Sequence, residues 1–168
     1  MSLGLPQNCT IELIVSDGPR IATSTVVVRV HNSAIEVGDL ALLFLTEFAD
    51  NTIPAATVVR NFSDSCSGKA SELKDVSDVR RDYRINSYTY GIPTVTVRFG
   101  ATCNAKSGDA CVRTSVEWKS TFKPSTPDER QVNPKGTSFI SGIYRESRWW
   151  LCDSTLDDPA TLGFWPMR

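Results

Sequence analysis

The chain has 168 residues, 40% of them hydrophobic, and a formal net charge of −1. That length suits one domain, here residues 1–168, which can bury its own core without help from a metal. The even balance of charge excludes nucleic-acid or anionic-membrane binding through overall charge, so such binding would need a local basic surface. The first residues lack the pattern of a secretory signal, and the longest apolar run, 40–45, is too short to span a bilayer. We therefore expect a cytoplasmic protein with no membrane contact.

Alternating polar and apolar residues dominate the N-terminal part and predict strands. Residues 11–15 alternate, Asp17, Gly18 and Pro19 supply a turn, and residues 23–30 (TSTVVVRV) are rich in β-branched side chains. Residues 39–48 (DLALLFLTEF) fit either a buried strand or a short helix. Further along, the pattern predicts a strand over 57–62 and a loop over 63–71.

The centre of the chain carries the clearest strand signals. Residues 81–90 predict a strand that ends in a turn at 91–93, and residues 94–99 (TVTVRF) alternate strictly. A polar loop over 100–111 then leads to a strand over 114–122. Two alternating strands joined by a glycine-bearing loop predict a long hairpin.

The C-terminal third changes character, because Pro124, Pro127 and Pro134 disfavour strands from 123 to 136. Residues 138–152 (SFISGIYRESRWWLC) predict a helix, weakened by Gly142. Strands first and helical signals last predict an α+β or mostly β fold, an antiparallel sheet with short C-terminal helical segments. The aromatic pairs 149–150 and 164–165 suit core packing or, alternatively, a subunit interface.

Catalytic and cofactor motifs are missing from the sequence. It contains neither a glycine-rich nucleotide loop nor a nucleophile elbow, and its single histidine, His31, follows a predicted strand. The five cysteines form no CxxC pair, so we expect no metal, no cofactor and no enzymatic activity. Most cysteines are expected to be reduced thiols, whereas Cys103 and Cys111 flank a polar loop and could bridge locally or between subunits.

Basic and aromatic residues recur along the central strands. By parity, Arg84, Tyr88 and Tyr90 share one strand face, and Arg98 and Lys119 occupy the polar faces of the next two strands. If these strands are neighbours, the five side chains form one surface, where cations meet phosphates and tyrosines stack on unpaired bases of single-stranded RNA. The alternative is an ordinary solvated sheet face.

Residues 73–130, about a third of the chain, resemble the coat proteins of single-stranded RNA bacteriophages. The segment LKDVSDVRRDYRINSYTYGIPTVTVRFGATC is similar to the central strands of that family, CNAKSGDAC to its cysteine-bearing loop, and SVEWKSTFKPSTPDER to the strand before its C-terminal helices. The resemblance implies a dimer with one continuous sheet, helices that clasp the partner, and an RNA-binding sheet face. It makes Cys103 and Cys111 candidate intersubunit links and Arg84, Arg98 and Lys119 candidate RNA contacts.

These observations together predict a structural function. We expect a viral coat protein that associates with itself into dimers and higher assemblies, resides in the virion after synthesis in the host cytoplasm, and holds RNA on one sheet face. A jelly-roll capsid protein belongs to the same class. A carbohydrate- or ligand-binding β-sandwich is the alternative from a different class, and an enzyme is the third.

Overall fold

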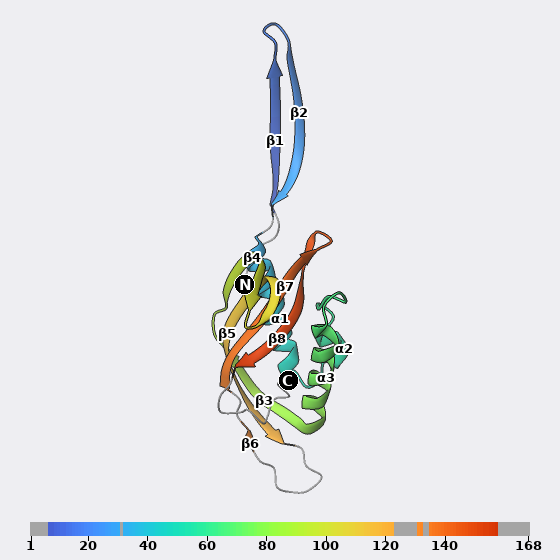
Figure 1. Ribbon diagram of the computed structural model, residues 1–168, viewed down its shortest axis with the longest axis vertical. Coiled ribbons are helices and arrows are strands. Elements are labelled where there is room, and N and C mark those ends of the chain that lie inside the picture. Colours follow the sequence, from blue (N-terminus) through green and yellow to red (C-terminus); the bar gives the residue numbers. More distant parts are fainter. Residues whose placement is uncertain (1–6, 31, 123–130, 133–134, 158–168) are drawn as a thin grey trace.

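The structure is a computed structural model that describes residues 7–30, 32–122, 131–132 and 135–157. His31 and the aromatic pair at 164–165 lie outside the described residues. The chain forms a body of helices and strands from which a separate β-hairpin projects (Figure 1). The predicted α+β class is confirmed, but the helices lie in the middle of the chain and not at its C-terminal end.

The hairpin consists of β1 (Gln7–Ser16) and β2 (Ile21–Val30), which pair antiparallel along their whole length. The predicted strands and the turn between them are confirmed. The turn closes through a hydrogen bond from the Asp17 amide to the Arg20 carbonyl oxygen, with Gly18 at a φ of 101°. That left-handed conformation is one that glycine adopts at little cost.

Three helices follow, and they cover one face of the sheet in the body (Figure 1). They are α1 (Ser33–Ala49), α2 (Ala55–Val58) and α3 (Gly68–Asp82). The ambiguous segment 39–48 is therefore helical: Asn32 caps α1 by accepting a hydrogen bond from the Ile35 amide. The strand predicted over 57–62 is wrong, because the chain turns into α2 directly after Pro54, a residue that suits a helix start.

The sheet is antiparallel and curls into a half-barrel around α1 (Figure 1). Its path runs β3–β5–β7–β8, with β4 and β6 also paired to β5. The strands are β3 (Tyr83–Tyr90), β4 (Thr94–Cys103), β5 (Lys106–Phe122), β6 (Gln131–Val132), β7 (Lys135–Arg145) and β8 (Arg148–Asp157). Because β3 pairs with residues 116–122 and β4 with residues 106–113 of β5, the two form one long edge. Residues 91–93, which the sequence predicts to form a turn, lie between β3 and β4 and interrupt the edge that these two strands form.

Two tight turns replace longer predicted features. The β4–β5 hairpin is confirmed, but its strands continue to a two-residue turn at Asn104 and Ala105, so the loop predicted over 100–111 is wrong. The helix predicted over 138–152 is also wrong, because this segment forms β7 and β8 around a turn at Glu146 and Ser147. All four turn residues have positive φ, the conformation that two-residue hairpin turns require.

The core lies between the helices and the concave face of the sheet. Its side chains include Phe44, Phe62, Val112, Ile140 and Leu151. Helix α1 approaches the sheet closely at Gly142, where a Cβ atom would lie only 2.6 Å from Val37 Cγ2. Trp149 is buried in this core, so the core interpretation holds for that tryptophan.

Two disulfides tie the body together. Cys66, just before α3, is bonded to Cys152 on β8, a separation of 86 residues. The prediction of reduced thiols is wrong for this pair. Cys103 and Cys111 are bonded to each other within the chain, so the local bridge is the one that forms, and neither sulfur is left to link a second subunit.

Candidate functional site: the apolar face of the hairpin

The five predicted RNA contacts do not share a surface. Arg84 and Lys119 lie on the outer face of the sheet, whereas Tyr88 pairs with the buried Trp118 on the inner face. The cause is a register shift between Ile85 and Ser87, a bulge that inverts the parity of the rest of β3. A parity argument from the sequence cannot anticipate such a bulge.

The remaining members of that set also serve other contacts or lie apart. Tyr90 stacks on Tyr88 at 5.9 Å between ring centroids, and its hydroxyl accepts a hydrogen bond from Thr46 of α1. Arg98 lies where the pairing of β4 with β5 shifts register, on an exposed stretch of that edge. The structure therefore brings the two tyrosines together and places Arg84 and Lys119 on the opposite face of the sheet.

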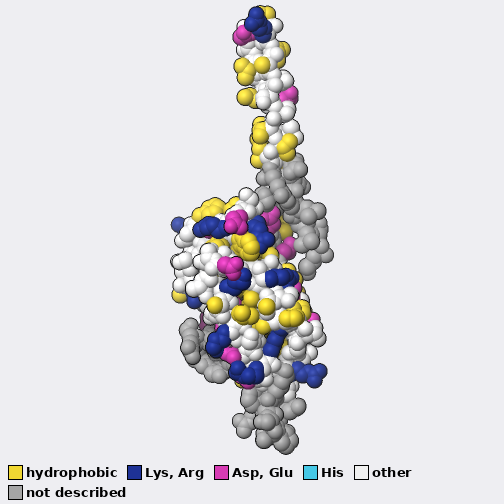
Figure 2. Space-filling view, turned by 90° about the vertical axis from the view of Figure 1, so that its right-hand side faces the viewer, with side chains coloured by type: hydrophobic (Ala, Val, Ile, Leu, Met, Phe, Trp, Pro, Cys, Tyr) yellow, Lys and Arg dark blue, Asp and Glu magenta, His cyan; other side chains and the backbone are white. Residues whose placement is uncertain are grey.

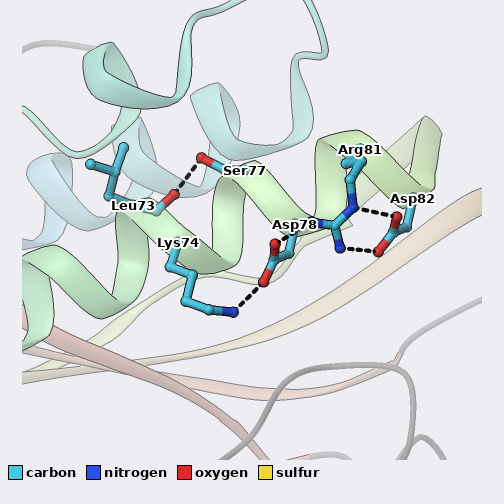
Figure 3. Close-up of polar contacts among 6 residues, drawn as sticks. All are labelled: Leu73, Lys74, Ser77, Asp78, Arg81 and Asp82. Atoms are coloured by element: carbon cyan, nitrogen blue, oxygen red, sulfur yellow. Dashed lines mark hydrogen bonds and ion pairs between the residues drawn. The ribbon is translucent and has the colours of Figure 1, made fainter.

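The charged face of α3 is balanced by its own ion pairs (Figure 3). Asp78 pairs with Lys74 and with Arg81, and Arg81 also pairs with Asp82 at 2.7 Å. The neighbouring Arg80 donates hydrogen bonds to the carbonyl oxygens of Glu47 and Asp50 at the end of α1. These cations are therefore paired with carboxylates or carbonyl oxygens of the body, and the side chains of Lys74 and Arg81 stay exposed.

One cavity on the concave side of the sheet, among the described residues, is too small for a ligand. A cavity of about 20 Å³ remains between α1 and the sheet, lined by core residues such as Phe44, Phe48 and Trp118. That volume holds about one water molecule. In the part of the chain that the structure describes, no cluster of three metal-ligating side chains is present, and no helix is long and apolar enough to cross a membrane.

Glu72 is a buried carboxyl group at the contact between α3 and β8. Its Oε1 accepts hydrogen bonds from the Ser154 amide at 3.1 Å and from the Ser154 hydroxyl at 2.8 Å. Burial raises the pKa of Glu72 to about 7, an effect that the Ser154 hydrogen bonds oppose and the nearby Asp75 and Asp153 reinforce. The carboxyl group titrates near neutral pH where α3 packs on β8, beside the Cys66–Cys152 disulfide. We therefore expect its titration to change the stability of the fold.

Among the described residues, the hairpin carries a long strip of apolar side chains that no other part of the chain covers. In an antiparallel pair, residues directly opposite one another point to the same side. The register pairs Ile11 with Val26, Leu13 with Ser24 and Val15 with Ala22. One side therefore gathers the residues that we call the apolar face: Cys9, Ile11, Leu13, Val15, Ala22, Ser24, Val26 and Val28.

The apolar face is uncharged and open to solvent. Ile11, Leu13, Val15 and Val26 are each more than half exposed, and the only polar member of the face is Ser24. The opposite side, which we call the polar face, contains Thr10, Glu12, Ile14, Ser16, Ile21, Thr23, Thr25 and Val27. Figure 2 shows hydrophobic side chains along the projecting hairpin, with basic and acidic side chains at its tip and acidic atoms also partway along it.

The exposed apolar area is large enough to drive association. At roughly 60–120 Å² for each aliphatic side chain, the seven apolar members offer about 600 Å². Exposed apolar patches of a few hundred Å² or more on a soluble protein commonly mark interaction sites. Burying this one would contribute roughly 15 kcal/mol before the entropic costs of association are subtracted.

Comparison with known proteins gives one general likeness. No protein-family model and no curated protein matches the chain. The crystal structure of the intermembrane space region of the chloroplast protein ARC6 matches with 12% sequence identity and a TM-score of 0.44. The match covers 72% of this chain and 96% of that chain. A likeness of this size implies nothing about binding or activity.

The coat-protein interpretation is wrong, and so are the virion and bacteriophage assignments that depended on it. The arrangement of the elements differs from the one that the resemblance implied. Helices α1 and α3 pack on this chain's own sheet, and the region expected to clasp a partner forms β7 and β8. The β-sandwich alternative is wrong as well, because helices and not a second sheet cover the core.

Proposed function

We propose that the chain is a non-catalytic interaction domain of an oxidising compartment, in which a disulfide-stabilised body presents the hairpin as a docking arm. The observation that carries the proposal is the apolar face, an uncharged, solvent-exposed strip on an arm that projects from the body. An isolated two-stranded hairpin is at best marginally stable in water, so a partner that covers this strip would also stabilise the arm.

The body is suited to support the arm. Side chains of α1 such as Phe44 and Phe48 pack against the concave side of the sheet, and the cavity beside them has a volume of only about 20 Å³. The Cys66–Cys152 bond fixes the start of α3 to β8. These features favour a rigid platform over a catalytic or ligand-binding pocket.

The compartment follows from the cysteine chemistry. Four of the five cysteines form intrachain disulfides. Such bonds form and persist in secreted, periplasmic and other oxidising environments, whereas cytosolic thiols are kept reduced. This argument favours an oxidising compartment over the cytoplasm expected from the sequence.

Site-specific photocrosslinking in the cells that make the protein tests the docking arm. A benzophenone amino acid at position 24 would lie in the middle of the apolar face, and the same amino acid at position 25 would lie on the polar face. We expect covalent protein adducts from position 24 and not from position 25. We also expect Ile11→Thr with Val26→Thr to abolish the adducts. Equal adducts from both positions, or none from either, would contradict the proposal.

A further inference from the structure

We propose that the partner of the apolar face is a second copy of this chain, so that two hairpins pack face to face and join two bodies into a homodimer. The inference rests on the proposed function, because it assumes that the apolar face is the docking surface. Two twisted hairpins packed in this way form a small two-layer β-sandwich, with layers about 10 Å apart. Each layer would present its polar face to water.

The area of the face suits such a dimer. The seven apolar side chains on each copy offer about 600 Å², so a pair would bury roughly 1,200 Å², the lower bound of stable protein interfaces. Ile11, Leu13 and Val15 alternate along one strand and face the same side as Val26 and Val28 of the other. This regular row of similar aliphatic side chains can interdigitate with a copy of itself.

The charge distribution favours self-association over a charged partner. A twofold interface places the same patch on both subunits, so every charge within it would meet surroundings of its own sign. The apolar face contains no charged side chain, and the hairpin's charged residues with described side chains, Glu12, Asp17 and Arg20, lie on the polar face or at the tip. Self-packing therefore brings no charges together.

The backbone of the hairpin disfavours a lipid partner. Among the described strands, β1 and β2 pair only with each other, so in this part of the chain their outer edges leave backbone amides and carbonyls without ladder partners. Such groups are satisfied by water in a face-to-face dimer, because only the side-chain faces are covered. In the hydrocarbon region of a bilayer they would be unsatisfied, which is why open sheet edges do not occur there.

Sedimentation equilibrium of the purified full chain tests the dimer. Every sample should carry Cys9→Ser, because Cys9 is a free, exposed thiol on the same face and could produce dimers by adventitious oxidation. A reducing agent is unsuitable for this purpose, since it would also attack the two structural disulfides. We expect a species of twice the 18.5 kDa chain mass at micromolar concentration.

Matched pairs of variants locate the interface. Ile11→Thr with Val26→Thr removes two facing aliphatic side chains from the apolar face of each copy and should raise the dimer dissociation constant by about 100-fold or more. Ile14→Thr with Val27→Thr makes the same chemical change on the polar face and should alter the constant by less than about threefold. Circular dichroism and intact-mass measurement verify that both variants fold with their disulfides formed.

The outcomes separate this inference from the proposed function. A chain that stays monomeric while position 24 still crosslinks to a different protein overturns the homodimer and leaves the docking arm standing. A dimer that both variant pairs weaken equally also overturns the inference. Flotation of the monomer with phospholipid vesicles, lost in the apolar-face variant, would replace the second copy with a lipid surface. Failure of the crosslinking contradicts the docking arm itself, and this inference with it.

Discussion

The body and the hairpin use the same kinds of side chain in opposite ways. In the body, Phe62, Val112 and Ile140 are fully buried between the helices and the sheet. In the hairpin, Ile11 and Leu13 are 54% and 62% exposed, although β1 and β2 pair without a register shift along their whole length. The body is a structure that satisfies its own apolar surface, whereas the hairpin forms only half of a packed layer. This difference is the reason for proposing the arm as the docking surface.

Covalent links make the same distinction. The Cys66–Cys152 bond holds the helical layer to the last strand, and Gly68 at the start of α3 lies so close to it that a Cβ atom would be 2.1 Å from the Cys152 carbonyl oxygen. In contrast, the only cysteine of the hairpin's described residues, Cys9, is free. The body is thus fixed internally in a way that the hairpin is not.

The largest expected effect comes from removing that long-range link. Cys66→Ala with Cys152→Ala should lower the free energy of unfolding by about 4–5 kcal/mol, because the bond closes a loop of 86 residues in the unfolded chain. The matched control is Cys103→Ala with Cys111→Ala, which removes a bond between residues only 8 positions apart. It should lower the free energy of unfolding by about 2–3 kcal/mol. Urea unfolding measures both. Equal losses would mean that loop length does not set the stability of the body.

The second prediction concerns the buried carboxyl of the body. Because the pKa of Glu72 is about 7 in the folded chain and 4.5 ordinarily, the folded state binds more protons than the unfolded state between these values. Stability should therefore fall as the pH rises from about 4.5 to about 7, by roughly 3 kcal/mol, and then level off. The charged groups facing Glu72 are Asp75 on its own helix and Asp153 on β8, and Asp153 is paired with Lys106.

Glu72→Gln should remove this dependence. The amide oxygen can still accept from Ser154, and an amide never acquires the charge that the buried site disfavours. We expect the variant to match the parent at pH 4.5 and to exceed it by up to about 3 kcal/mol at pH 8 in urea unfolding. Glu12→Gln, at an exposed hairpin position, serves as the control and should leave both values unchanged. A parent whose stability rises from pH 4.5 to 8 would contradict the assignment.

The sequence predicts the exposed, alternating strands well and the buried, irregular parts poorly. Residues 11–15 and the strands β4 and β5 follow from alternation, which arises wherever one side of a strand differs from the other, and β2 follows from its β-branched side chains. Residues 138–152 look helical because the turn at Glu146 and Ser147 contains no glycine, proline or asparagine to mark it. The bulge in β3 leaves no sequence signal either, so the predicted RNA surface could not be corrected without the structure.

The candidate site itself is partly readable from the sequence. The sequence shows alternation before the Asp17-Gly18 turn and a strand rich in β-branched residues after it, and an antiparallel register follows from the turn. The amino-acid sequence does not show that nothing in the described body packs against the hairpin's apolar face. That depends on the tertiary arrangement, in which residues 32–157 complete their core without the hairpin.

The smallest expected effect completes the comparison. A chain that begins at His31 keeps the Asn32 cap of α1 and every described residue of the core, so its body should unfold within about 0.5 kcal/mol of the full chain at nanomolar concentration. At tens of micromolar the full chain should melt at a higher temperature than at nanomolar concentration, because dimer formation stabilises the folded state by mass action, whereas the shortened chain should show no such dependence. Fluorescence-monitored melting over that range measures both. A shortened chain that loses 2 kcal/mol or more would show that the hairpin belongs to the body's own core, and the distinction between a complete body and an incomplete arm would fail.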